Sequence, residues 1–173
     1  TASRDRTIKL WDTDTSIADT DAAVQPIAEY LSESPLSGID HHRTESTFAT
    51  AGHNLDLWDV NRTRPVQSFN WGDETINACK FNKIEVHLVA CCMNDRGVCV
   101  YDTRTKAGHS KTIMDLTCTS LSWNPMDPNM FVASSDDWNC YLFDLRVTGR
   151  PRSVFQGHIH PVIHHEKAFH PPG

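Results

Sequence analysis

An aromatic residue followed by Asp recurs four times in this chain, and the repeat constrains the fold more than any other feature. The pairs are Trp11-Asp12, Trp58-Asp59, Tyr101-Asp102 and Phe143-Asp144. Their aromatic residues stand 47, 43 and 42 positions apart. Apolar residues occupy the positions one and three before each aromatic residue, an alternation that predicts a strand with one buried face. Four copies in register predict a repeated structural unit.

The repeated unit extends beyond this strand. Six residues before the aromatic residue, three copies carry an Asp within a polar stretch that predicts a tight turn: Asp5, Asp95 and Asp137. The second copy has Gly52 there, in a turn that is one residue shorter. Alternating runs before the turn and after the motif bring the count to four short strands per unit, and no stretch shows a helical period.

A unit of roughly 40–45 residues with four strands and a Trp-Asp signature resembles the WD repeat, one blade of a β-propeller. We therefore predict an all-β fold in which residues 1–173 form a partial propeller. Blades are expected to end near residues 12, 59, 102 and 144, and a fifth to begin near 157. These blades, about four, are not expected to close a ring. The acidic insertion at 12–26 is predicted to be a solvated, mobile loop.

The resemblance to WD blades implies structural roles for several residues. In such blades the turn Asp accepts hydrogen bonds from backbone amides and from a buried His, and His158 stands where such a His belongs. The residues expected to be structural on these grounds are Asp5, Trp11, Trp58, Asp95, Asp102, Asp137, Asp144 and His158.

Composition excludes some functions. The chain carries 16 Lys and Arg against 22 Asp and Glu, a net charge of −6, which disfavours dominant direct binding to nucleic acid. Apolar runs fall short of the ~18 residues of a membrane span, so no membrane partner is expected. The six Cys contain no C-x-x-C pair. We interpret them as reduced, half-buried core residues.

Histidine clusters raise the question of a metal. One is His41-His42, and the other comprises His164, His165, Glu166 and His170. Zinc needs about four converging ligands, whereas neighbouring strand residues point to opposite faces and the two clusters belong to different blades. We expect turn and strand-end histidines. No nucleophile elbow, P-loop or H-E-x-x-H is present, so we predict no enzyme, metal, cofactor or small-molecule substrate.

Two copies of the motif end in an arginine three residues after the aromatic residue. These are Arg104 in "YDTR" and Arg146 in "FDLR". One interpretation is a solvated arginine that pairs weakly with a nearby carboxylate. The other is a partner-binding residue, because the ending resembles the box of WD-repeat substrate receptors of cullin-RING ubiquitin ligases. In those receptors the arginine docks the ligase adaptor.

A basic loop follows the last motif, with Arg150 and Arg152 beside Arg146. Together with Arg62 and Arg64 in the equivalent loop one blade earlier, it is a candidate phosphate-binding rim, since loops on a rigid scaffold carry partners. The alternative is that these are ordinary turn residues that keep an edge soluble.

Longer stretches resemble one WD family, the Sof proteins. They include "GIDHHRTESTFATAGHNLDLWD" (38–59), "RTRPVQSFNWGDETINACKFN" (62–82), "LVACCMNDRGVCVYDTR" (88–104) and "SLSWNPMDPNMFVASSDDWNCYLFDLR" (120–146). The similarity covers about residues 37–158 and ends before "HPVIHHEKAFHPPG". It implies central blades of a seven-bladed propeller.

The Sof resemblance also implies a function. Members of the family are nucleolar, non-enzymatic components of the small-subunit processome, which assembles around precursor rRNA and a box C/D snoRNP. Metazoan members resemble cullin-RING receptors as well, and there Arg104 and Arg146 become the candidate adaptor contacts. Processome scaffolding and ligase-adaptor binding therefore both stay open.

Overall fold

The computed structural model describes residues 1–13, 24–70, 72, 74–105, 108–113, 117–147 and 149–162. It is all-β. Its strands are β1 (Thr7–Leu10), β2 (Ala28–Leu31), β3 (Gly38–His41), β4 (Thr47–Ala51), β5 (Leu55–Asp59), β6 (Gln67–Phe69), β7 (Ile76–Phe81), β8 (Leu88–Met93), β9 (Gly97–Asp102), β10 (Gly108–Ile113), β11 (Cys118–Trp123), β12 (Met130–Ser135), β13 (Cys140–Asp144) and β14 (Ser153–Phe155).

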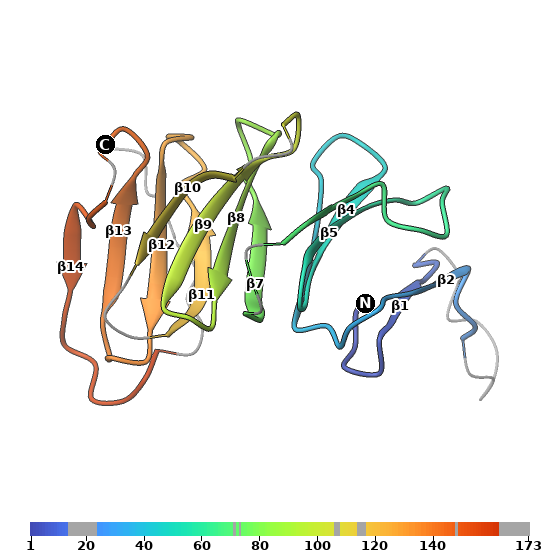
Figure 1. Ribbon diagram of the computed structural model, residues 1–173, viewed down its shortest axis with the longest axis horizontal. Coiled ribbons are helices and arrows are strands. Elements are labelled where there is room, and N and C mark those ends of the chain that lie inside the picture. The colour runs from blue at the N-terminus through green and yellow to red at the C-terminus, as the bar shows by residue number, and fades with distance from the viewer. Residues whose placement is uncertain are drawn as a thin grey trace.

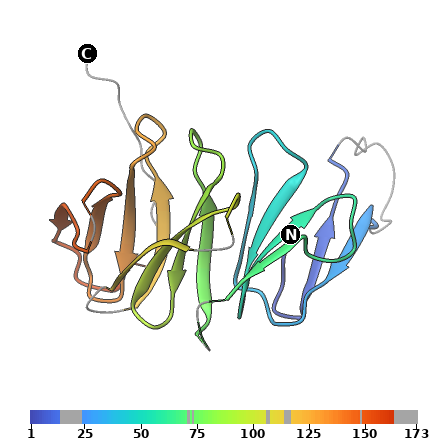
Figure 2. The same ribbon diagram turned by 45° about the horizontal axis from the view of Figure 1, so that its top comes forward.

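Consecutive strands pair antiparallel into four sheets. Three sheets have four strands each, β3 to β6, β7 to β10 and β11 to β14, and β1 pairs with β2. The sheets lie side by side in an arc with β2 near one end and β14 at the other, and the arc does not close (Figures 1 and 2). This is the arrangement of propeller blades, and it confirms the predicted fold class. The expected fifth blade lies mostly outside the described residues, and no strand occurs in 156–162.

Neighbouring sheets pack face to face, and the space between each pair holds a separate apolar core. Leu55 and Phe69 belong to the core shared by β3–β6 and β7–β10, whereas Trp123 and Phe131 belong to the core between β7–β10 and β11–β14. A third core, around Trp58, joins β1–β2 to β3–β6. Since β9 is packed on both sides, Gly97 to Tyr101 are all buried, where the alternation had predicted one buried face.

Polar groups also tie the blades together. Trp123 Nε1 donates to the backbone oxygen of Lys80 at 2.9 Å, and Asn77 Nδ2 donates to that of Cys118 at 3.0 Å. Asn82 Nδ2 reaches the backbone oxygen of Pro128 at 2.7 Å. Because these bonds satisfy buried groups between adjacent sheets, they set how one blade sits on the next.

The cysteine prediction is wrong for two residues. Cys92 and Cys118 form a disulfide between β8 and β11, with their Cα atoms 5.2 Å apart and a sequence separation of 26. Blade stacking brings them together, which strand spacing does not reveal. Cys79, Cys91 and Cys99 are thiols that are fully buried rather than half-buried, and Cys140 is partly exposed.

The predicted tight turns are present between the second and third strand of each blade. Asp5, Asp95 and Asp137 each accept a hydrogen bond from the amide two residues later, at 2.8, 3.0 and 3.1 Å. The residue between has a left-handed backbone: φ is 70° at Arg6, 65° at Arg96 and 69° at Trp138. The short second turn needs Gly52, because a Cβ there would lie 2.7 Å from Ser34 Oγ and 2.8 Å from the Pro35 oxygen.

We predict that Trp58→Phe destabilises the fold by roughly 1–3 kcal/mol, the usual cost of an unsatisfied buried polar group. Trp58 is 1% exposed and its Nε1 donates to Thr50 Oγ1 at 2.9 Å, so the shorter ring leaves a buried hydroxyl without this partner. Urea unfolding of the full-length protein measures the change. Trp138→Phe is the matched control, because Trp138 is 50% exposed, and its effect should stay within about 0.5 kcal/mol. Equal losses of stability in both variants would show that burial and hydrogen bonding of Trp58 are not the cause.

Candidate partner-binding site

The turns that carry the candidate arginines lie on one face of the arc. We call it the arginine face and define it by the turns after β5, β9 and β13, together with those after β3, β7 and β11. Contacts between the turns support this grouping: Arg146 Nη2 lies 3.3 Å from Asp127 Oδ2 in the turn after β11, and Arg43 Nη1 donates to the Lys83 oxygen at 2.8 Å. Partners approaching this face meet all of these turns.

The motif aspartates cap their turns. Asp59, Asp102 and Asp144 each accept the backbone N–H two residues later through Oδ1, at 2.9, 2.9 and 3.0 Å. The signature Asp therefore holds the chain reversal after the third strand of each blade, an Asx-turn that fixes where the next side chains point. Sequence reasoning assigned Asp102 and Asp144 to structure without identifying this bond.

Arg104 forms a two-pronged ion pair with the Asp of its own motif. Nε lies 3.0 Å from Asp102 Oδ1 and Nη2 lies 2.7 Å from Oδ2. The side chain nevertheless stays 62% exposed, and Nη1 makes no bond to the described residues. Hydrogen bonding by Arg104 lowers the pKa of Asp102 from 3.8 to about 2. Both earlier interpretations fit this geometry, since the arginine pairs internally and still presents donors to solvent.

Arg146 is more heavily engaged. Its Nε and Nη2 bind the two oxygens of Asp144, both at 2.8 Å, and Nη2 also reaches Asp127. Arg152 Nη1 adds a second cation at 3.2 Å from Asp144 Oδ2. Hydrogen bonding by Arg146 holds the pKa of the almost fully buried Asp144 at about 2. Val147, Arg150 and Arg152 line a shallow cavity of about 460 Å³ beside this cluster.

The proposed five-arginine rim does not form. Arg62 and Arg64 belong to the turn after β5, whereas Arg146, Arg150 and Arg152 belong to the turn after β13, and the sheet β7–β10 stands between. The sequence analysis placed the two loops one blade apart, but the order of the sheets places them two blades apart. Arg62 instead lies 3.8 Å from Asp59.

Two expected structural residues are placed differently from the prediction. Trp11 is 36% exposed, with Nε1 donating to Thr1 Oγ1 at 2.9 Å. His158 was predicted to be buried and is exposed. It follows β14 in a segment, 156–161, in which every residue is exposed, whereas Asp137 bonds with Ser135, Asn139 and Tyr141 from its own hairpin.

Sequence reasoning missed a second set of turn caps. His42, Asn82 and Asn124 follow the first strand of their blades, are buried, and accept backbone N–H groups of the next turn. For Asn82 the acceptor is Oδ1 and the donor is Glu85 N at 3.0 Å. Their recurrence at spacings of 40 and 42 residues was a usable signal.

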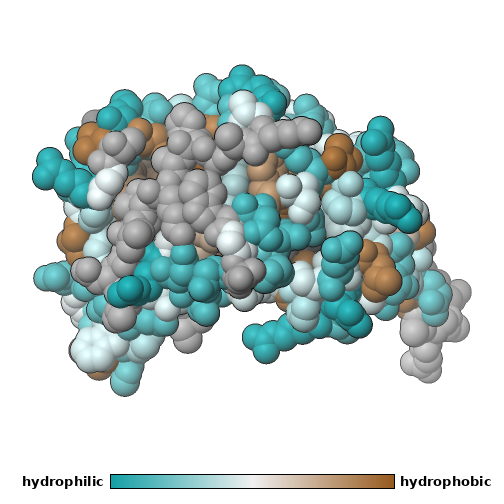
Figure 3. Space-filling model, viewed as in Figure 1, coloured by the Kyte–Doolittle hydropathy of each residue, from teal (hydrophilic) through white to brown (hydrophobic). Residues whose placement is uncertain are grey.

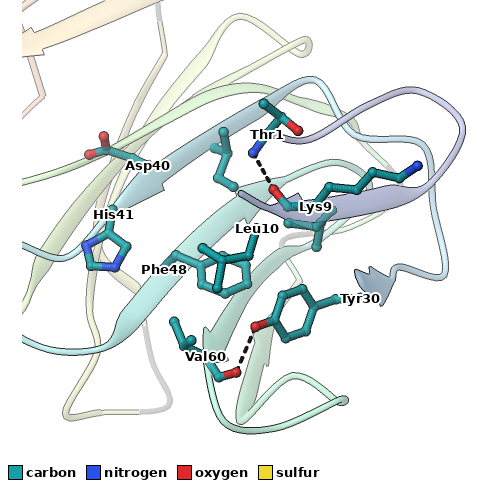
Figure 4. A pocket seen from close by; sticks show the side chains of 10 residues that line it. Thr1, Lys9, Leu10, Tyr30, Asp40, His41, Phe48 and Val60 are labelled. Atoms are coloured by element: carbon teal, nitrogen blue, oxygen red, sulfur yellow. Dashed lines mark hydrogen bonds between the residues drawn. The ribbon is translucent and has the colours of Figure 1, made fainter. Parts of the chain in front are cut away.

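Other cavities and clusters offer less chemistry. An apolar pocket of about 280 Å³ lies between β1 and β3–β4, where Leu10, Tyr30 and Phe48 line it and Tyr30 donates to the Val60 oxygen at 2.7 Å (Figure 4). Within the described ranges, no three His, Cys, Asp or Glu side chains gather as metal ligands, and no helix is long and apolar enough to cross a membrane. The cluster at 164–170 lies outside those ranges.

Known proteins resemble the chain closely. The family model "WD domain, G-beta repeat" matches residues 103–144. DDB1- and CUL4-associated factor 13 of Danio rerio is 37% identical over 163 residues, which are 94% of this chain and 36% of that protein. Protein SOF1 of Saccharomyces cerevisiae is 35% identical over 170 residues, 93% of this chain and 35% of that protein.

The chain is a WD-repeat homologue of these two proteins. Protein sof1 of Schizosaccharomyces pombe adds a third relative, 40% identical over 134 residues and covering 78% of this chain and 31% of that protein. The resemblance to the Sof family is thereby confirmed. The chain spans about a third of the length of these relatives.

We predict that Arg146→Ala weakens the acid dependence of stability. The native pKa of Asp144, about 2, lies below its ordinary 3.8, so the ionised carboxylate stabilises the fold above about pH 4 and this contribution is lost as the pH falls through about 2. Removing Arg146 brings the native pKa nearer to 3.8. Denaturant unfolding of the full-length protein between pH 4 and 2 should then show a shallower fall.

Arg150→Ala is the matched control for this experiment. Arg150 lies in the same turn and makes no ion pair to the described residues, so its variant should keep the wild-type slope. The same shallow slope in both variants would mean that general charge, and not the Arg146–Asp144 pair, produces the effect.

Proposed function

We propose that this chain is part of a non-enzymatic WD-repeat scaffold that acts in small ribosomal subunit assembly and pre-rRNA processing in the nucleolus. The observation that carries the proposal is the similarity to Protein SOF1, which extends over 93% of the chain and therefore through turns as well as strands. The family resemblance links such chains to processome proteins and a box C/D snoRNP.

The physical character of the molecule supports protein contacts. Stacked sheets with capped turns make a rigid frame, and loops on such a frame carry partners. The net charge of −6 opposes close approach to RNA, so RNA contact is expected to be mainly indirect, through bound proteins. Among the residues coloured by hydropathy in Figure 3, most are hydrophilic and the hydrophobic ones stand in small separate patches.

Sedimentation of the tagged full-length protein from nuclear extract tests the assembly role. We expect it to migrate in very large particles together with precursor rRNA, and ribonuclease treatment should release it from them. Migration only in small complexes free of precursor rRNA would contradict the proposal.

A second function is favoured by one geometric observation. Arg104 is held by Asp102 yet stays exposed on the arginine face, which suits recognition of a partner's carboxylate. Relatives bear the name DDB1- and CUL4-associated factor 13. We propose that the full-length protein also docks a ligase adaptor, DDB1, through Arg104, as a substrate receptor of a cullin-RING ligase. The two functions are compatible in one protein.

The two motif arginines are not equivalent in this role. Arg146 binds two carboxylates, those of Asp144 and Asp127, so its guanidinium makes more internal contacts. Among the described residues, Arg104 pairs with one carboxylate, that of Asp102. A partner's acidic side chain therefore competes with fewer internal contacts at Arg104.

We predict that Arg104→Ala weakens binding of the full-length protein to purified DDB1 by about tenfold or more, the range for truncating one partner of a charged pair. Arg146→Ala should weaken it less, and biolayer interferometry compares the two. Circular dichroism confirms that each variant is folded. Unchanged binding by Arg104→Ala would remove this residue from the docking site.

A further inference from the structure

A pocket opens on the arginine face between two blades, directly beside the turn of Arg104. We call it the inter-blade pocket; it has a volume of about 240 Å³ and is lined by Leu57, Val66, Phe81, His42, Gln67 and Thr103, together with the charged side chains of Glu45, Asp59 and Arg62. Leu57 and Val66 come from the blade β3–β6, and Phe81 and Thr103 from the blade β7–β10. Thr103 is the chain neighbour of Arg104.

The interior of the pocket continues the apolar core between these blades. Phe81 is a member of that core, and Leu57 packs against it. The His42 ring meets Phe81 edge to face, with centroids 5.3 Å apart. An apolar side chain that entered the pocket would therefore pass from water into contact with this core, which is favourable.

The rim of the pocket is fixed in place. Gln67 Nε2 donates to the Thr105 oxygen at 3.2 Å, which ties the two blades together across it. Val66 N donates to the Leu57 oxygen at 2.7 Å, and Thr103 N to the His87 oxygen at 2.8 Å. With its backbone held, the Val66 side chain is still 54% exposed. A preorganised rim with an exposed apolar residue lowers the entropic cost of binding.

Size and charge define the occupant. The pocket is smaller than the roughly 300–1,000 Å³ of sites for drug-sized ligands, and fits a single side chain better than a whole small molecule. Arg104 beside it leaves Nη1 outside its pair with Asp102, so an anion can bind there. Apolar anchors in pockets flanked by charged contacts are the usual centres of protein interfaces.

We propose that Arg104 and the inter-blade pocket form one docking site for a short acidic–apolar segment of the adaptor. Its acidic side chain pairs with Arg104, and a neighbouring aliphatic or aromatic side chain fills the pocket against Leu57 and Phe81. This inference rests on the adaptor-docking function proposed above and adds the second contact point and the chemistry of the partner segment.

Binding of the full-length protein to purified DDB1 tests the proposal with Val66→Asp. A carboxylate at the rim disfavours entry of an apolar side chain and repels the acidic segment, so we expect affinity to fall by about tenfold or more. Val66→Ile should bind as the wild type does. Val154→Asp is the matched control, because Val154 is 44% exposed on β14, the outer strand of another blade, and should leave affinity unchanged.

The outcomes distinguish this inference from the adaptor-docking function on which it rests. Loss of affinity in both Arg104→Ala and Val66→Asp supports the two-point site. Loss in Arg104→Ala alone overturns the pocket and leaves adaptor docking in place. Wild-type affinity in Arg104→Ala, or no binding of DDB1 by the wild type, overturns both. Equal loss in Val154→Asp shows an effect of charge anywhere on the surface and also overturns the pocket.

Discussion

Face-to-face stacking of the sheets is the constraint on which the rest of this structure depends. A four-stranded antiparallel sheet with apolar residues on both faces has no stable environment alone, and the blades β3–β6 and β7–β10 bury both faces against their neighbours. Cys91 and Cys92 illustrate the result: they are adjacent on β8, yet one lies in the core shared with β3–β6 and the other in the core shared with β11–β14.

Capped turns gather side chains from several blades on one face of the stack. The motif Asp closes the turn after the third strand, and the buried His or Asn after the first strand closes the turn beside it. Both kinds of turn lie at the same end of every blade, so the side chains they orient share one face. Arg104 is presented because Asp102 holds both its backbone amide and its guanidinium.

The junctions between blades create surfaces that no single repeat contains. The inter-blade pocket has one wall from Leu57 and another from Phe81, which belong to different sheets. The disulfide between Cys92 and Cys118 and the bond from Trp123 to Lys80 also cross such a junction. The docking site proposed at such a junction depends on the stacking geometry, and therefore on residues that are remote from one another in sequence.

Local spacing and strand alternation were enough to predict the repeat, the all-β class and the tight turns at Asp5, Asp95 and Asp137, and the resemblance to the receptor box singled out Arg104 and Arg146. The tertiary structure was needed to show that Cys92 pairs with Cys118, that the two basic loops stand apart, that Arg146 binds two carboxylates where Arg104 binds one, and that a pocket opens beside Thr103. Those outcomes depend on distances between blades, which a period along the chain does not encode.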